Sequence, residues 1–214
     1  MELNWNNPAV GVYCVETKTL VADLSTRLQQ TKANLKDMLD SMSKWYQNPL
    51  LVRDPKNNLI VFEDKDKLLG AGRQLVEAAG KRFQELKVQT RALFKASEDD
   101  ACWRTYVEYM DQLVLDGLYN TVHCTLSYVL DNMEGSSDGG PRPLMKGSMT
   151  LKPPEIVFTP VIRTPDGPGP GSFVFQVQTI IDDVFKFGAL VARLASHTLN
   201  PDYRSDVCLF GQDQ

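Results

Sequence analysis

One segment, from Pro8 to about Tyr46, carries apolar side chains at the spacing of an α-helix along its length. Asn7 followed by Pro8 is typical of a helix start, and Asn48-Pro49 stops the pattern. The stripe consists of Leu20, Leu24, Leu28, Leu35, Met38, Leu39, Met42 and Trp45. At 1.5 Å per residue, this helix is about 58 Å long. Such a helix belongs to a rod or a bundle and does not fold around a compact active site.

Two further segments carry similar stripes. A second helix is predicted from about Asp64, with its stripe at Leu68, Leu75, Ala79, Phe83, Leu86, Thr90 and Leu93. The run Ser97 to Asp100 ends it and places acidic groups at the start of a third helix, where the helix dipole favours them. The third stripe consists of Trp103, Tyr106, Val107, Met110, Val114, Leu118, Val122, Leu126, Val129 and Leu130. Because these residues cover more than one face, we expect the third helix to be central.

Between the helices, several segments have the character of strands and loops. Residues 50–52 and 59–62 predict two short extended pieces around a turn, and so a hairpin near 49–62. After a Gly/Pro/Ser-rich loop at 135–143, a second hairpin is predicted from residues 145–151 and 155–162.

The C-terminal part predicts one more helix. A loop rich in glycine and proline, Gly167 to Gly171, leads into a helix over about 172–196. Its stripe consists of Val174, Val177, Ile180, Ile181, Val184, Phe187, Leu190 and Leu194. Residues from Asn200 onward are weakly patterned, and we expect them to be frayed.

Together these patterns predict a mainly α fold, an elongated antiparallel helical bundle with a small β-hairpin insertion. Three parts are expected along the chain. Residues 1–134 form a bundle of three long helices with a short hairpin near 49–62. Residues 135–171 form a loop and a β-hairpin, and residues 172–214 form a final helix that packs on the bundle and ends in a frayed C-terminus.

Composition and charge exclude several classes of protein. The chain has 214 residues, is 43% hydrophobic and has a formal net charge of −4, so it has no general attraction for nucleic acid or anionic lipid. No apolar run is long enough to span a membrane, and the first residues lack a secretory signal. We therefore expect residence in the cytoplasm or cytoskeleton, with no nucleic-acid or membrane partner. Reduced, buried thiols are then expected at Cys14, Cys102, Cys124 and Cys208.

Candidate catalytic and metal-ligating residues are few. His123 and Cys124 are adjacent, but neighbours on a helix point about 100° apart, so they do not form a dyad. We interpret His123 as lying at a helix interface and Cys124 as core filler. The other histidine, His197, lies near a helix C-terminus, where a cationic ring is favourable without catalysis. Two histidines and scattered cysteines provide no zinc site, so we expect no catalytic residue, no metal and no cofactor.

Glycine-rich, acidic and aromatic groups have structural interpretations too. Gly70-Ala71-Gly72 lacks the strand and the lysine of a phosphate loop, and the prolines within Gly167–Gly171 remove backbone donors. The pairs Asp99-Asp100 and Asp182-Asp183 could bind a cation, but contiguous acids on a helix are usually a solvated face or a first turn. Five aromatic residues could form a ligand cage, but their helical spacing favours packing. These residues are Trp5, Trp45, Trp103, Tyr106 and Tyr109.

Several motifs resemble the N-terminal tail region of axonemal dynein heavy chains, most closely the outer-arm type. They are Leu3 to Asn6, the run Val114 to Asn132, the hairpin Met149 to Pro160, and the helix Ile180 to Phe185, which continues through Leu190 to Leu194. The resemblance covers nearly the whole chain, with the motifs in the same order. The loop Gly167 to Gly171 departs from the family, in which a shorter lead into the final helix is expected.

The resemblance implies a parent protein that is an ATP-driven microtubule motor of cilia and flagella. It implies that this segment lies late in the tail, ahead of the linker and the motor ring, and that it carries no Walker A motif or stalk. The implied role is structural, and the implied partners are dynein intermediate and light chains and other heavy chains. A second hypothesis is a helical adaptor that recruits a light chain or an assembly factor through residues 144–171.

Overall fold

The computed structural model describes residues 6–51, 59–134, 144–164, 166–167 and 169–195. In chain order its elements are α1 (Pro8–Tyr46), the 3-10 helix η1 (Phe62–Asp64), α2 (Lys65–Phe94), α3 (Ala101–Glu134), β1 (Ser148–Lys152), β2 (Glu155–Thr159), α4 (Phe173–Phe185) and the 3-10 helix η2 (Lys186–Leu190). The fold is mainly α with a small β-hairpin, as the sequence predicts.

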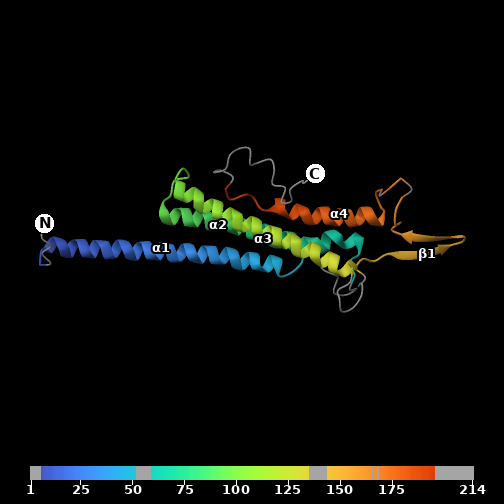
Figure 1. Cartoon of the computed structure of the whole chain (residues 1–214), viewed down its shortest axis with the longest axis horizontal. Coiled ribbons are helices and arrows are strands. Elements are labelled where there is room, and N and C mark those ends of the chain that lie inside the picture. Colours follow the sequence, from blue (N-terminus) through green and yellow to red (C-terminus); the bar gives the residue numbers. More distant parts are fainter. Residues whose placement is uncertain (1–5, 52–58, 135–143, 165, 168, 196–214) are drawn as a thin grey trace.

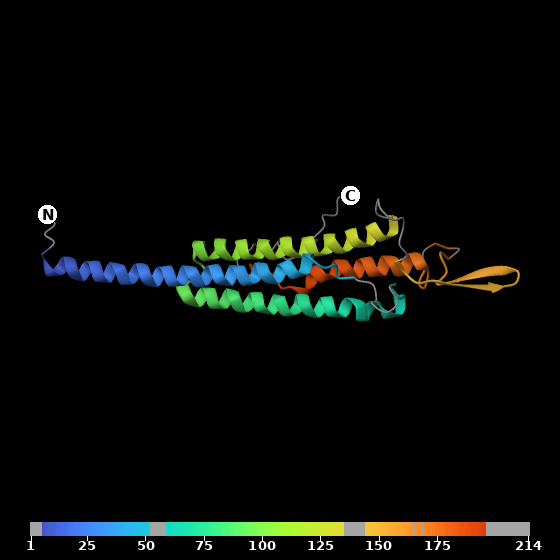
Figure 2. The ribbon, with the colours of Figure 1, turned by 90° about the horizontal axis from the view of Figure 1, so that it is seen from below.

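The helices lie along one long axis, and each of α1, α2 and α3 is antiparallel to the next α-helix in the chain (Figures 1 and 2). α1 contacts α2 and α3, and α4 contacts α3. α3 therefore has neighbours on several sides, which agrees with its apolar residues on more than one face. The β1–β2 hairpin projects from one end of the bundle, and the first half of α1 projects from the other end (Figure 1).

α1 starts where the sequence predicts, because the Asn7 side-chain oxygen accepts a hydrogen bond from the Ala9 backbone N–H at 3.0 Å and Pro8 occupies the first turn. Only the second half of the helix is packed. Met38, Met42 and Trp45 are buried and Leu35 is half-buried, whereas Leu20, Leu24 and Leu28 are exposed. The apolar stripe thus runs beyond the part of α1 that α2 and α3 cover (Figure 2).

Close packing of the helices forms the core beside the second half of α1. The Trp45 ring lies 5.7 Å from the Phe83 ring of α2, measured between centroids. On the α3 side, Gly117 faces Met42, and a Cβ atom at Gly117 would lie 2.8 Å from the Met42 sulfur. A glycine at this position therefore permits α1 and α3 to approach closely.

The hairpin predicted near residues 49–62 is not what the described residues form. Its turn falls within residues 52–58, outside the described part of the chain. Ile60 instead forms a parallel bridge with Met145: its N–H donates to the Leu144 carbonyl at 2.7 Å, and its carbonyl accepts from the Lys146 N–H at 2.9 Å. The backbone at Ile60 thus pairs with a segment far along the chain. Local turn signals do not predict such a partner.

The second predicted hairpin is confirmed, with shifted bounds. β1 and β2 pair antiparallel, with Met149 opposite Phe158 and Leu151 opposite Ile156. These four residues share one face of the hairpin, since side chains alternate along a strand. All four are exposed, so the apolar face of the hairpin is uncovered in the described structure.

The final helix is shorter than the predicted range of 172–196. Ser172 caps α4, its hydroxyl accepting from the Phe175 N–H at 3.2 Å, but α4 ends at Phe185 and the chain continues as η2 and an extended segment. Phe187, Val191 and Leu194 are still buried. The apolar stripe correctly predicted burial of Ile180, Val184, Phe187 and Leu194 but did not include Val191, and the backbone is not α-helical beyond Phe185. Residues 196–214, including the predicted frayed end, lie outside the described residues.

None of the described helices has the length and apolar character needed to cross a lipid bilayer.

Candidate functional site

His123 and Cys124 lie in different environments on α3. His123 is exposed and its ring stacks on Tyr119 at 6.0 Å between centroids, while Cys124 is half-buried. The interface position predicted for His123 is therefore wrong, because the buried face of α3 passes through Val122 and Thr125. The prediction of buried thiols is also wrong for Cys14 and Cys102, which are free and exposed. His197 and Cys208 lie outside the described residues.

Gly72 and one acidic pair have structural positions. Gly72 lies inside α2, where a Cβ atom would be 3.0 Å from Leu50 and 3.3 Å from Phe187. Asp100 caps α3, its carboxylate accepting from the Cys102 N–H at 2.9 Å, and Asp99 pairs with Arg104 at 2.7 Å. Among the described residues, no group of three His, Cys, Asp or Glu side chains is placed to hold a metal ion.

The aromatic residues that could form a ligand cage do not converge on one site. Trp45 packs on Phe83, while Trp103 stacks on Tyr106 with ring centroids 5.6 Å apart. Tyr109 is exposed, and Trp5 lies outside the described residues. Burial raises the pKa of the Tyr106 hydroxyl. These positions support packing at the bundle end, not recognition of a ligand by an aromatic cage.

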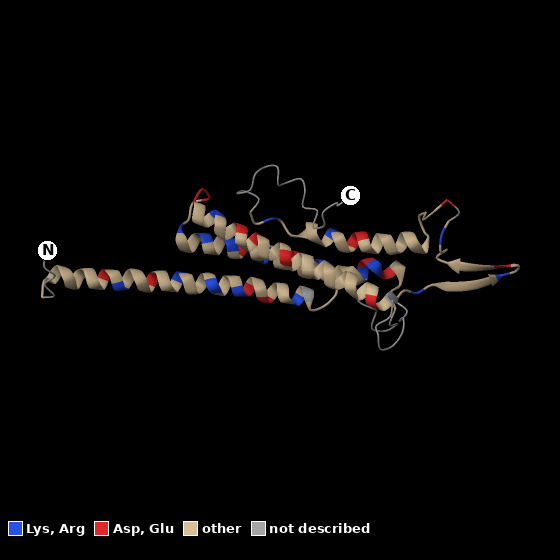
Figure 3. Ribbon diagram, viewed as in Figure 1, with Lys and Arg blue, Asp and Glu red and all other residues tan. Residues whose placement is uncertain are grey.

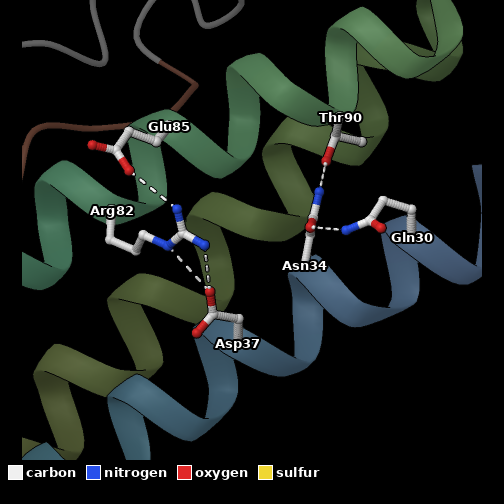
Figure 4. Close-up of polar contacts among 6 residues, drawn as sticks. All are labelled: Gln30, Asn34, Asp37, Arg82, Glu85 and Thr90. Carbon is white, nitrogen blue, oxygen red and sulfur yellow. Dashed lines mark hydrogen bonds and ion pairs between the residues drawn. The ribbon is translucent and has the colours of Figure 1, made fainter.

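A buried amide links α1 to α2 (Figure 4). Asn34 is 3% exposed, and its side-chain N–H donates to the Thr90 hydroxyl at 2.9 Å. The Gln30 side-chain N–H donates to the Asn34 side-chain oxygen at 3.1 Å. Sliding one helix along the other would leave these buried polar groups unpaired, which costs free energy. The contact therefore fixes the register of α1 against α2, as a buried asparagine does in coiled coils.

An ion pair repeats this link further along α1 (Figure 4). Arg82 of α2 donates from Nε and Nη2 to the Asp37 carboxylate at 3.1 and 3.0 Å, and from Nη1 to Glu85 at 3.1 Å. Hydrogen bonds to Glu85 and Asp37 raise the pKa of the Arg82 guanidinium. Because all three side chains are open to solvent, the contact adds little to the stability of the fold.

Asp183 ties α4 to the start of α2. Its carboxylate accepts from Lys65 at 3.1 Å and from Lys186 at 2.9 Å, and the residue is 7% exposed. Burial by itself would raise the pKa of this carboxyl, but hydrogen bonds from Lys186 and Lys65 outweigh burial and hold the pKa below its usual value. The solvated face predicted for Asp182-Asp183 is therefore right for the exposed Asp182 and wrong for Asp183.

Asp111 holds the segment that follows η2. It is 2% exposed, accepts from Arg193 Nε at 2.6 Å, and accepts from the Leu194 backbone N–H at 2.7 Å. Lys87 of α2 donates to the Leu194 carbonyl at 2.7 Å. These bonds satisfy backbone groups that a continued helix would have paired internally, which explains why α4 need not extend to residue 196.

Sequence reasoning missed Asn34, Asp111 and Asp183 as buried polar contacts. A signal existed for Asp111, which sits between the core residues Met110 and Val114 of the third stripe. Asn34 likewise precedes the stripe residue Leu35. A polar residue beside a core stripe indicates a partner across the interface, although it does not identify that partner.

The chain is similar to known dynein heavy chains. No family model matches it. It is 34% identical over 208 residues to the ciliary dynein beta chain of Tripneustes gratilla, 28% identical over 206 residues to human dynein axonemal heavy chain 9, and 26% identical over 198 residues to the flagellar outer arm dynein beta chain of Chlamydomonas reinhardtii.

These matches cover 96%, 96% and 90% of the chain, but only 4% of the length of each relative. The similarity therefore includes α1, both ends of the bundle and the hairpin, and it concerns one small part of much larger proteins. The chain is a homologue of one segment of the axonemal dynein heavy chains.

Proposed function

We propose that this chain is a structural segment of a dynein heavy-chain tail, joining the anchored base of the complex to the linker and motor ring. In this role it supports the assembly of heavy chains with intermediate and light chains for ciliary motility. Its site of action is then the axoneme of a cilium or flagellum, with assembly in the cytoplasm. Neither nucleic acid nor a membrane is a partner in this proposal.

The single observation that carries the proposal is a long bundle whose helices are held in register by polar contacts between them. Asn34–Thr90 and Asp37–Arg82 connect α1 to α2, and Asp111 connects α3 to the segment after η2. Helices packed along their length resist bending, and paired polar groups resist sliding. Both properties suit a segment that transmits force along its axis.

We assign no reaction to this segment itself. His123 and Cys124 are the residues that came nearest to a nucleophile and base, and one is exposed while the other is half-buried. A turnover that required either residue, lost on substitution without unfolding, would contradict this assignment. Under this assignment, the ATPase activity of a dynein motor belongs to other parts of the parent protein.

Stretching single molecules tests the mechanical role. With handles at the two ends of the isolated chain, optical tweezers should record one cooperative unfolding event at forces above those that a motor generates. Matched variants, Asn34→Ala in the buried register contact and Asp40→Ala on the exposed face of α1, separate register from general stability. The first should lower the unfolding force and the second should not. Gradual extension at very low force would identify the segment as a tether.

The exposed apolar face of the hairpin favours a second candidate function, an adaptor that recruits a light chain or assembly factor. Replacing Met149 and Phe158 with serine in a full-length heavy chain should then reduce recovery of one subunit in a pull-down. Replacing Thr150 and Thr159, on the opposite face, with serine provides the control. Unchanged recovery of every subunit, also after deletion of residues 144–171, would rule out the hairpin as the docking site.

A further inference from the structure

The apolar stripe of α1 follows one heptad register from its projecting first half into the bundle. The a positions are Cys14, Val21, Leu28, Leu35 and Met42, and the d positions are Val10, Thr17, Leu24, Thr31, Met38 and Trp45. A sustained heptad of this kind is the pattern of a helix that packs along a helical partner. We refer to these a and d positions from Val10 to Leu28 as the free seam.

The same register is buried at one end and uncovered at the other. Met38, Met42 and Trp45 are buried against α2 and α3, but Val21, Leu24 and Leu28 are 61%, 51% and 54% exposed. The free seam extends for about 27 Å, or five helical turns. Tyr13 and Leu20, at the adjoining g positions, are exposed too and widen it. An apolar stripe of this length facing solvent marks an interaction surface.

A cavity lies where the free seam enters the bundle. It has a volume of about 400 Å³, and Leu28 and Thr31 of α1 line it together with Phe94, Trp103 and Tyr106 near the turn between α2 and α3. The lining is mainly apolar, although Thr90 and Asp100 also line it. A helix lying along the free seam would therefore bring its end to an apolar hollow that a large side chain could fill.

Charge beside the free seam limits which helix could lie there. The charged residues at the e and g positions beside the free seam are Lys18 and Arg27, and Lys32 occupies the next e position; all three are basic. The acidic residues of this half, Glu16 and Asp23, are at c positions on another face, and Asp23 pairs with Arg27 at 2.5 Å. Figure 3 shows acidic and basic residues interspersed along α1.

In a coiled coil the e and g residues face those of the partner helix. A second copy of the chain would place lysine against lysine in antiparallel pairing, and Arg27 against Lys32 in parallel pairing. Either arrangement brings like charges together, which disfavours association. A partner with glutamate or aspartate at its e and g positions would instead gain opposite-charge pairs on both sides of the seam.

We propose that the free seam of α1 binds an amphipathic helix of a partner protein that carries acidic residues beside its own apolar seam. The inference rests on the proposed tail role for its setting and specifies the chemistry of one partner there. It differs from the hairpin site, which lies at the opposite end of the bundle (Figure 1).

Peptide binding to the whole chain tests the proposal. The probe is a labelled helical peptide of three heptads, with leucine at a and d and glutamate at e and g; a matched peptide carries lysine at e and g. Fluorescence anisotropy should show the acidic peptide binding about tenfold or more tightly than the basic one, with affinity that falls as salt is added. Equal binding of both peptides would contradict the charge argument.

Substitutions on the chain locate the binding surface. Val21→Lys with Leu24→Lys should weaken binding of the acidic peptide by about tenfold or more, whereas Val12→Lys with Val15→Lys should leave it unchanged. All four residues are exposed, so the variants keep the fold, which circular dichroism checks. Lys18→Glu with Lys32→Glu should reverse the preference toward the basic peptide.

Two outcomes overturn the proposal. One is binding that persists undiminished in the Val21/Leu24 variant. The other is a dimer of the unmodified chain in sedimentation that the Val21/Leu24 variant dissociates, which would make a second copy the occupant. Pull-downs of dynein subunits with a heavy chain carrying the unmodified segment test the tail role separately, so failure of one idea does not imply failure of the other.

Discussion

Asp111 lies on the buried face of α3 and binds Arg193, which follows it by 82 residues in the chain. The carboxylate also accepts from the Leu194 backbone N–H. Arg193 is itself partly buried, so removing the carboxylate would leave a cation and a backbone donor without this acceptor. At the residue scale, stability depends on such buried pairs. Water cannot replace the removed partner of a buried polar group, so the group that remains is left unsatisfied.

Asp111→Ala should lower the free energy of unfolding by about 3 kcal/mol. The measurement is urea denaturation followed by tryptophan fluorescence. Asp116→Ala is the matched control, since Asp116 is an exposed carboxylate on the same helix that accepts a Gln112 hydrogen bond at 2.9 Å. The control should change stability by no more than about 0.5 kcal/mol. Equal effects of both substitutions would show that the Asp111 contacts add little.

Asp183 makes stability depend on pH in the acidic range. Its pKa is lower in the folded chain than in the unfolded chain, so its carboxylate stabilises the fold above the unfolded pKa, and this contribution is lost as pH falls through the folded pKa. Unfolding measured from pH 7 down to pH 2 should therefore show a smaller acid-induced loss for Asp183→Asn than for the unmodified chain. Asp182→Asn, at an exposed neighbour, should retain the full loss.

At the scale of elements, different interactions stabilise the two halves of α1. Its second half is held by the core and by Asn34, while its first half relies on local helix propensity and on contacts such as Asp23–Arg27. An uncovered helix of this length is only marginally stable in water, because most helix stability in proteins comes from packing. The two halves should therefore open independently.

Hydrogen exchange followed by mass spectrometry should resolve this difference. Backbone amides of residues 12–27 should exchange at least about tenfold faster than those of residues 34–45, because the former open without unfolding the core. Binding of an acidic helix to the free seam should slow exchange in the first range only. Uniform protection along α1 in the chain alone would mean that the free seam is already covered.

On the scale of the whole molecule, the described bundle has contact surfaces at both ends. The free seam of α1 lies at one end and the apolar face of the β1–β2 hairpin at the other (Figure 1). Between them, α1, α2, α3 and α4 are linked by the core and by buried polar contacts. Such a layout suits a segment that joins two neighbours along its long axis, in agreement with the proposed tail role.

The elongated shape has a direct consequence in solution. A compact domain of this length would have a radius of gyration of about 17 Å. Small-angle X-ray scattering of the monomer should give a clearly larger value, with a pair-distance distribution that has a long tail. A value near that of a compact domain would mean that α1 folds back on the bundle, which would cover the free seam and contradict its availability to a partner.

Local patterns in the sequence were enough to predict the helices, the second hairpin and the start of α1. Asn7-Pro8 begins that helix, and the apolar spacing from Leu35 to Trp45 predicts which face it buries, because capping and periodicity depend on residues close in sequence. The resemblance to dynein heavy chains likewise followed from short motifs along the chain, and the similarity to known proteins confirms it.

Only the tertiary structure decided which parts of those patterns are used. The stripe of α1 reads the same at Leu24 as at Met38, yet α2 and α3 cover only the second. Asp111 and Asp183 find partners more than 80 residues away, so no local pattern identifies them. α4 likewise ends at Phe185, and, further along, the backbone of Leu194 bonds to side chains of α2 and α3. Periodicity specifies a face, whereas the partner of that face depends on how the helices pack.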